Sequence, residues 1–258
     1  MSAASAKYIP EGFQAVTPYL VVPGLARLID FLQSVFGAEE KFRSPRTDGS
    51  IQHAELRLGD SIVEMGEPAG DKWKAMPAAL HCYFPGVDGI YERAVKAGAK
   101  ILTKPTQMNY GDYETDFEDP SGNQWYVGMR RSGASIAPEG FHSVNIGLRA
   151  EGAKELIAFL QGAFGAETQF IQETNEGKVA YSTVRLGNSI LEVGDPHGQW
   201  AARPTALHYY VEDSDAVFSK ARAAGAEELS PVAQQPYGER SGSARDAWGN
   251  HWYIATRT

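Results

Sequence analysis

The chain has 258 residues, a formal net charge of −8 and a single cysteine, Cys82. A surface this acidic repels phosphate backbones and anionic lipid, so nucleic acid and membranes are not expected as partners, and no apolar run approaches bilayer-spanning length. One cysteine excludes an internal disulfide, which fits a reducing compartment, and residues 1–7 lack the apolar stretch of a signal peptide. Composition therefore predicts a cytoplasmic globular protein and slightly favours neutral or cationic ligands.

The first elements predicted along the chain are a strand and an amphipathic helix. Residues 16–22 are rich in β-formers, and the apolar side chains of residues 25–36 recur at intervals of three and four. Gly37 stands where a C-cap glycine is expected. A weaker strand signal follows at residues 39–43, so the chain begins with a strand, a helix and a strand.

A hairpin and a second round of the same elements follow. Residues 51–58 and 61–65 read as two strands, because the two-residue turn Gly59-Asp60 separates them. The remaining predicted elements are a strand at 80–84, a helix at 87–97 closed by Gly98, a weak strand at 100–103, and strands at 113–118 and 123–129. The order strand, helix and three strands thus occurs twice before residue 130.

The second half of the chain repeats the first. Pro10-Glu11-Gly12-Phe13 returns as Pro138-Glu139-Gly140-Phe141, an offset of 128 residues that also carries Glu64 onto Glu192. After one deletion the offset becomes 127, and ordered matches continue to the end of the chain. Matches this numerous predict a tandem duplication.

The repeat predicts two modules, at residues 8–130 and 136–258, joined by a short polar linker over 130–135. Each module contains two βαβββ units, which predicts an α+β fold of curved sheets with the helices on the outer face. The opposite face of the sheet is then free to line a cleft.

Strand alternation assigns side chains to the two faces of each sheet. Ala54 is expected to face a helix, for example, so its neighbours His53 and Glu55 point to the cleft. Polar groups there can be hydrated when the cleft is empty and paired when a ligand fills it. The candidate lining is His53, Glu55, Arg57, Glu64, His81, Tyr83, Tyr110 and Tyr126 in the first module, and Tyr181, Arg185, Glu192, His208, Tyr210, Tyr237 and Tyr253 in the second.

Chemistry-bearing side chains are few. Asp119 and Asp246 stand in turn sequences and are expected to form turns, and Cys82 falls on the apolar side of its strand. The chain contains no Gly-rich phosphate loop, HExxH, CxxC or GxSxG motif, so nucleophilic, hydride and phosphoryl mechanisms lack support. The catalytic candidates are the carboxylate and imidazole that both modules carry, Glu64, His81, Glu192 and His208.

These motifs resemble the vicinal oxygen chelate superfamily, which includes glyoxalase I, bleomycin-resistance proteins and extradiol dioxygenases, and within it the PhnB-like group. The segments that carry the resemblance are Thr17-Pro18-Tyr19-Leu20, Phe36-Gly37-Ala38-Glu39, residues 53–61, Leu80-His81, Tyr110-Gly111 and residues 119–125. The resemblance extends over nearly the whole chain, because each of the two repeats carries it. It implies the fold but not one function, because the same fold hosts unrelated activities.

Metal-dependent members of that superfamily hold an ion with four ligands, and the resemblance implies where those positions fall. They are Pro18, Glu64, His81 and Tyr126 in the first module, and Ile146, Glu192, His208 and Tyr253 in the second. Proline and isoleucine cannot coordinate an ion and a neutral tyrosine is a poor ligand, so the resemblance implies no complete metal site and no other cofactor. A divalent metal is the alternative, and dioxygenase activity, which needs two histidines and a carboxylate, is not expected.

Three functions stay open at this point. The first is a glyoxalase- or bleomycin-resistance-like protein that binds a small apolar or aromatic ligand in the cleft. The second is a metal-dependent lyase or isomerase of the glyoxalase type, in which Glu64 and His81 meet Glu192 and His208 across the module interface. The third is a structural or regulatory module whose role is association, with pairing as a homodimer left open.

Overall fold

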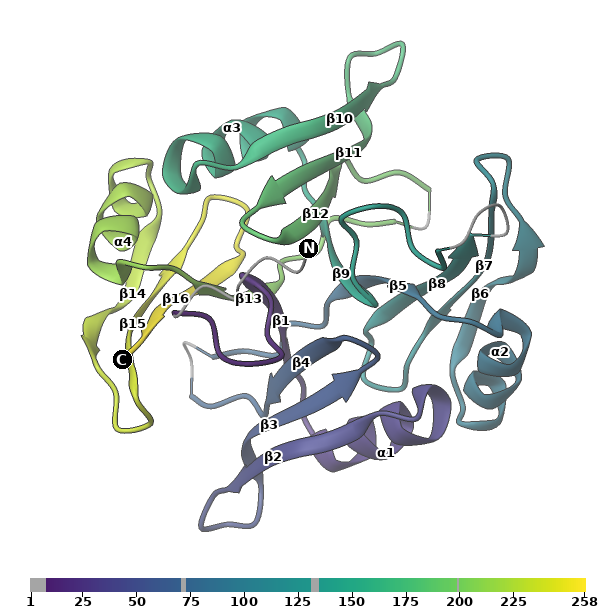
Figure 1. The fold of residues 1–258 in the computed structure, drawn as a ribbon, viewed down its shortest axis with the longest axis horizontal. Coiled ribbons are helices and arrows are strands. Elements are labelled where there is room, and N and C mark those ends of the chain that lie inside the picture. The colour runs from purple at the N-terminus through teal and green to yellow at the C-terminus, as the bar shows by residue number, and fades with distance from the viewer. Residues whose placement is uncertain (1–7, 71–72, 131–134, 199) are drawn as a thin grey trace. The chain divides into compact units, whose positions relative to one another are not determined.

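The structure is a computed structural model that describes residues 8–70, 73–130, 135–198 and 200–258. Two segments discussed above lie outside the described residues. They are residues 131–134 of the expected linker and residues 1–7, in which no signal peptide was expected. In the described residues the order strand, helix and three strands occurs four times, as expected for a duplicated unit (Figure 1). No helix in the described ranges is long and apolar enough to cross a membrane.

Two compact units make up the chain: residues 18–147 form one, and residues 1–17 together with 148–258 form the other. Each unit boundary falls inside a strand, β1 (Val16–Val21) or β9 (Val144–Arg149). The compact units are therefore displaced from the sequence repeats by about one strand.

The unit of residues 18–147 contains two βαβββ arrangements, which build two separate sheets. Its further elements are α1 (Leu25–Phe36), β2 (Glu39–Pro45), β3 (Ile51–Leu58), β4 (Ser61–Gly66), β5 (Ala79–Tyr83), α2 (Val87–Lys96), β6 (Lys100–Gln107), β7 (Asp112–Glu118) and β8 (Gln124–Arg130). One sheet has the order β1-β4-β3-β2, and the other β9-β5-β8-β7-β6. Parallel pairing of β1 with β4, and of β5 with β8, closes each arrangement on itself. The residues expected to line one cleft per module are thus divided between two sheets.

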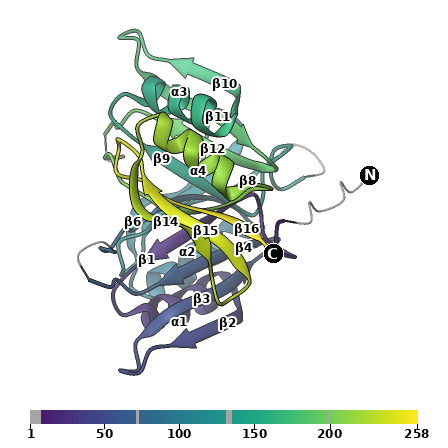
Figure 2. The ribbon, with the colours of Figure 1, turned by 90° about the vertical axis from the view of Figure 1, so that its left-hand side faces the viewer.

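The other unit repeats this order. Its elements are α3 (Ala153–Phe164), β10 (Glu167–Glu173), β11 (Val179–Leu186), β12 (Ser189–Gly194), β13 (Ala206–Tyr210), α4 (Ser214–Ala223), β14 (Glu227–Gln234), β15 (Glu239–Arg245) and β16 (His251–Arg257). The strands follow the orders β10-β11-β12-β9 and β14-β15-β16-β13-β1. Helices α3 and α4 lie side by side on the outer side of their strands (Figure 1; Figure 2). The α+β prediction of tandem βαβββ units is confirmed.

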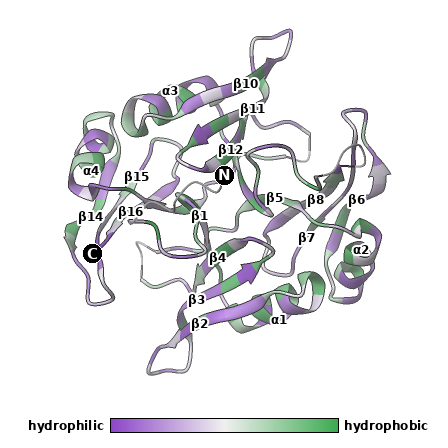
Figure 3. Ribbon diagram, in the orientation of Figure 1, coloured by the Kyte–Doolittle hydropathy of each residue, from purple (hydrophilic) through white to green (hydrophobic). Residues whose placement is uncertain are grey.

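Local sequence explains which face of the first helix is buried and where the helix ends. Leu25, Leu28 and Leu32 share one face of α1 and are fully buried. Gly37 adopts the left-handed conformation (φ 69°), and its N–H closes the helix on the carbonyl of Gln33. By contrast β2 is solvent-exposed and mainly hydrophilic, which is why its sequence signal is weak (Figure 3).

The turn before β8 depends on the buried carboxylate of Asp119. One of its oxygens accepts the backbone N–H groups of Ser121 (2.7 Å) and Asn123 (3.1 Å). The other accepts the Asn123 amide (2.8 Å) and the Trp125 indole N–H (2.9 Å). Burial raises the pKa of Asp119 although these four hydrogen bonds oppose the rise. The expected turn-forming role is confirmed, and Asp246 repeats it in the other unit.

Candidate functional site

A histidine, two tyrosines and a carboxylate meet on the face of β5–β8 that is turned away from α2. The His81 ring stacks on Tyr83, with ring centroids 4.5 Å apart. His81 Nε2 lies 3.7 Å from the Glu114 carboxylate, whose other oxygen accepts a 2.6 Å hydrogen bond from the Tyr110 hydroxyl. Tyr110 itself is 58% exposed, so only its hydroxyl end joins this cluster.

Strand register brings two further polar side chains to His81. In the parallel β5–β8 pair His81 stands opposite Tyr126, whose hydroxyl donates to Gln124 (2.8 Å). In the antiparallel β5–β9 pair His81 stands opposite Asn145, whose amide donates to the His81 carbonyl (3.2 Å). The face is therefore a band of ring and amide groups around one imidazole.

Buried carboxylates give this face its electrostatic character. Asp112, Glu114 and Asp116 alternate along β7 and all three are buried. Burial raises the pKa of Glu114 and of Asp116, and the His81 imidazole only partly offsets the effect. Burial and the Glu114 carboxylate likewise raise the pKa of Tyr110. Sequence reasoning missed Glu114, although acids at every second position of a strand are a visible signal.

The raised pKa of Glu114 predicts a pH-dependent stability difference. The folded protein binds the Glu114 carboxyl proton more tightly than the unfolded chain does. The contribution of this proton to the stability of the fold is therefore complete at low pH and is lost as the pH rises through the raised pKa. We expect Glu114→Gln, which still accepts the Tyr110 hydroxyl, to melt at a higher temperature than the wild type at pH 8. Thermal melts should show this advantage shrinking towards about pH 4. A variant less stable than the wild type at pH 8 would contradict the prediction.

The other unit rebuilds the same cluster with a different carboxylate. His208 stacks on Tyr210 (centroids 4.2 Å apart), and its Nε2 lies 3.4 Å from Glu239. In the repeat Glu239 corresponds to Asp112, while Ser241 takes the place of Glu114. The histidine–tyrosine stack and a neighbouring carboxylate are thus common to both units, but the strand position that supplies the acid is not.

The β1-β4-β3-β2 sheet of residues 18–147 carries a separate cluster of polar side chains on β3 and β4. His53 Nε2 lies 3.2 Å from Glu55 and 3.9 Å from Glu64, and its Nδ1 lies 3.2 Å from the Tyr19 hydroxyl. At the corresponding positions of the other unit the Tyr181 hydroxyl donates a hydrogen bond to Glu192 (2.6 Å). Alternation placed His53 and Glu55 on this face, whereas Tyr19 was missed.

The remaining expected lining residues differ in position, since Arg57 and Tyr237 are exposed whereas Tyr253 stands opposite His208 in the parallel β13–β16 pair. Arg57 is exposed, with Nε 3.9 Å from Glu39, and Tyr237 is 68% exposed in the turn before β15. Arg185 stands opposite Glu167 in the β10–β11 pair. The Tyr253 ring lies 6.3 Å from that of His208. Their roles as ligand contacts stay predictions.

The ligand positions implied by the family do not form a metal site in residues 18–147. Glu64 is paired in register with Tyr19 rather than with the expected Pro18, because the parallel β1–β4 register turns Tyr19 to that face. Asn145, not Ile146, stands beside His81. Glu64 and His81 belong to different sheets. The donors at these positions therefore do not fit a four-ligand ion site, and no chemistry is derived from one.

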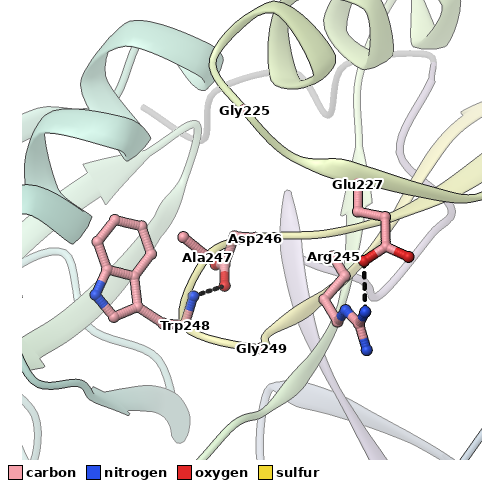
Figure 4. A pocket seen from close by; sticks show the side chains of 7 residues that line it. All are labelled: Gly225, Glu227, Arg245, Asp246, Ala247, Trp248 and Gly249. Carbon is pink, nitrogen blue, oxygen red and sulfur yellow. Dashed lines mark hydrogen bonds and ion pairs between the residues drawn. The ribbon is translucent and has the colours of Figure 1, made fainter.

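A surface hollow of about 510 Å³ lies elsewhere, at the turn before β16. Figure 4 shows its lining, in which Arg245 pairs with Glu227 and the Trp248 backbone N–H donates to Asp246 (3.0 Å). The Asp246 carboxylate is fully used in holding its turn. None of the expected site residues lines this hollow, which we regard as a by-product of the turn.

Comparison with known proteins gives a family and a fold. Residues 13–127 match the sequence profile of the Glyoxalase/Bleomycin resistance protein/Dioxygenase superfamily. An uncharacterized protein of Mycobacterium bovis is 33% identical over 125 residues, which are 45% of this chain and 82% of the relative. An uncharacterized protein of Mycobacterium tuberculosis shares the same identity, over 74% of its length. Glyoxalase I from Zea mays superposes with a TM-score of 0.70 at 16% identity, covering 93% of this chain and 92% of that one.

Proposed function

Because the chain belongs to the glyoxalase/bleomycin resistance protein/dioxygenase superfamily, whose fold hosts unrelated activities, we propose that it binds a small apolar or aromatic ligand. One ligand molecule lies on the polar face of β5–β8, and a second ligand molecule lies on the equivalent face of β13–β16. The stacked rings supply a flat apolar surface, and the neighbouring carboxylate accepts a hydrogen bond from the ligand.

One observation carries this proposal: the His–Tyr stack with a carboxylate occurs in both units, although different strand positions supply the acid. Simple copying of the repeat would have kept Glu114 and its counterpart in register. Instead Ser241 stands at that position and Glu239 provides the acid. Both repeats carry an acid at the Glu239 position, where the first repeat has Asp112, so the second unit keeps a carboxylate beside its histidine although the counterpart of Glu114 is lost. Because a buried carboxylate is costly unless it is paired, its retention there favours a role for the pair itself.

Fragment binding by the full-length protein tests the proposal. We expect fluorinated aromatic fragments, followed by ¹⁹F NMR, to bind at two sites per chain with dissociation constants below about 1 mM. His81→Ala and His208→Ala should each remove one site, and the double variant both. The control is Tyr113→Phe, which alters a β7 residue that donates to Asp88 instead. Failure of every fragment to bind, or unchanged binding in the double variant, would exclude the proposed ligand face.

A metal-dependent lyase or isomerase is the second candidate. The observation that favours it is the His53, Glu55 and Glu64 cluster, since an ion held there could polarise a substrate oxygen. Turnover that needs added metal and disappears with Glu64→Gln would favour this candidate over simple binding. Membership of the PhnB-like group stays a prediction that rests on the motifs alone.

A further inference from the structure

Three potential metal-ligand side chains converge on the β1-β4-β3-β2 sheet of residues 18–147. His53 and Glu55 are two positions apart on β3 and therefore share a face, and Glu64 stands directly opposite Glu55 on β4. One donor atom from each of the three lies within 4.8 Å of the others. Among the described residues this is the one group of three or more such side chains with that spacing.

Two of the three side chains are carboxylates that repel each other. Like charges directly opposite each other on neighbouring strands destabilise a sheet. Here the two are Glu55 and Glu64, and the Glu64 side chain is only 3% exposed. A buried carboxylate normally needs a paired charge or a metal ion. One imidazole can balance at most one of the two negative charges, whereas a divalent ion balances both.

Tyr19 orients the histidine for this role. Its hydroxyl lies 3.2 Å from His53 Nδ1, on the side of the ring opposite to the two carboxylates. Without an ion, the Nε2–H of His53 donates to the Glu55 carboxylate. When an ion replaces that proton, the remaining ring proton lies on Nδ1 and is donated to the Tyr19 hydroxyl, which leaves the Nε2 lone pair for the ion. Metal-bound histidines are held in this way, by a hydrogen bond at the nitrogen that does not bind the ion.

We propose that His53, Glu55 and Glu64 bind one first-row divalent transition-metal ion. Of the positions implied by the family resemblance only Glu64 is used, so this donor set is a different one. One imidazole nitrogen and two carboxylates suit zinc, cobalt or manganese better than magnesium or calcium, which prefer oxygen ligands throughout. His53 and Glu55 are each about one-quarter exposed, so open coordination positions face solvent. The site is distinct from the ligand face proposed on β5–β8.

The duplication supplies an internal control. Tyr181 and Thr183 replace His53 and Glu55 in the other unit, and Glu192 replaces Glu64. There the carboxylate accepts the Tyr181 hydroxyl at 2.6 Å, and two of the three donors are gone. The proposal therefore specifies one ion per chain, not two.

Cobalt titration of the tag-free, chelator-treated full chain tests the site. Calorimetry should give one equivalent of Co²⁺. Visible absorption bands should appear in the same titration, and their intensity reports the coordination number of the bound ion. Glu64→Gln and His53→Ala should weaken binding by more than about 100-fold, and Tyr19→Phe by about tenfold or more, as expected for loss of an outer hydrogen bond. Glu192→Gln and Tyr181→Phe, the matched controls, should bind as the wild type does.

Several results would overturn the proposal: no Co²⁺ binding by the wild type, two equivalent sites, or unchanged affinity in Glu64→Gln. Displacement of Co²⁺ by millimolar Ca²⁺ would also overturn it, because it would indicate an all-oxygen site. If the buried Glu64→Gln variant does not fold, Glu55→Gln changes the more exposed carboxylate and should give the same loss. Circular dichroism of each variant separates loss of the ion from loss of the fold.

Discussion

Asp119→Ala is expected to destabilise the unit of residues 18–147 by about 4 kcal/mol, because it leaves several buried donors without an acceptor. The carboxylate is 4% exposed and accepts four hydrogen bonds, including those of the Asn123 amide and the Trp125 indole. Alanine replaces none of these acceptors, and water has little access. Urea denaturation followed by tryptophan fluorescence measures the loss.

Two companion variants make this test specific. Ser121→Ala keeps the backbone N–H that donates to Asp119, so it should change stability by less than about 0.5 kcal/mol. Asp246→Ala removes the equivalent carboxylate and should cost the other unit about as much as Asp119→Ala costs the first. A loss below about 1 kcal/mol in both aspartate variants would mean that the turns relax and find other partners.

Phe117→Ala is the second substitution with a large expected effect, about 3–5 kcal/mol, because it empties a fully buried site. The Phe117 ring packs against Phe31 (centroids 6.2 Å apart) and Phe36 (6.1 Å). These contacts join β7 to helix α1. Chemical denaturation of the variant measures the loss, and a value below about 1 kcal/mol would show that the core collapses to fill the space.

The other unit indicates how the cavity can be refilled. There Ala244 stands at the position of Phe117, and Tyr209 at that of Cys82. Tyr209 packs against Phe164, the counterpart of Phe36, with centroids 5.2 Å apart. Large and small residues have thus exchanged places while the helix-end phenylalanine keeps an aromatic neighbour.

A double-mutant cycle tests whether this exchange is compensatory. Cys82→Phe alone should overpack the core and cost about 1–3 kcal/mol. Combined with Phe117→Ala it should recover at least about 1 kcal/mol of the combined loss. Phenylalanine is preferred to tyrosine here because it introduces no hydroxyl that needs a partner. Additive losses in the cycle would show that the two positions do not share space.

The sequence predicts the order of elements well, because the relevant signals are local. Glycine at Gly37 and the Gly59-Asp60 turn mark ends that the structure confirms. Which strands pair over long distances is not encoded in such signals. The parallel β1–β4 register, which pairs Tyr19 rather than Pro18 with Glu64, joins strands more than 40 residues apart and is such a case. The division of each module between two sheets is another.

Part of the candidate site can be predicted from the sequence. Alternation correctly placed His53 and His81 on the faces away from the helices. The two-residue hairpin turn also fixes Leu58 opposite Ser61, and counting back from it puts Glu55 opposite Glu64. The proximity of Glu114 to His81 could not be derived in this way, because β5 and β7 both pair with β8 and not with each other.

The strand β9 has a consequence for any half-length version of this protein. Val144 to Gly147 pair antiparallel with β5 although they follow the first repeat in sequence. A single repeat ending near residue 130 would leave the backbone N–H and C=O groups of that side of β5 open, and an open edge recruits strands from other molecules. In the tandem chain a covalently tethered segment supplies the missing strand at an effective concentration of millimolar order. Fusion of the repeats thus replaces a concentration-dependent association with a step that occurs within one molecule.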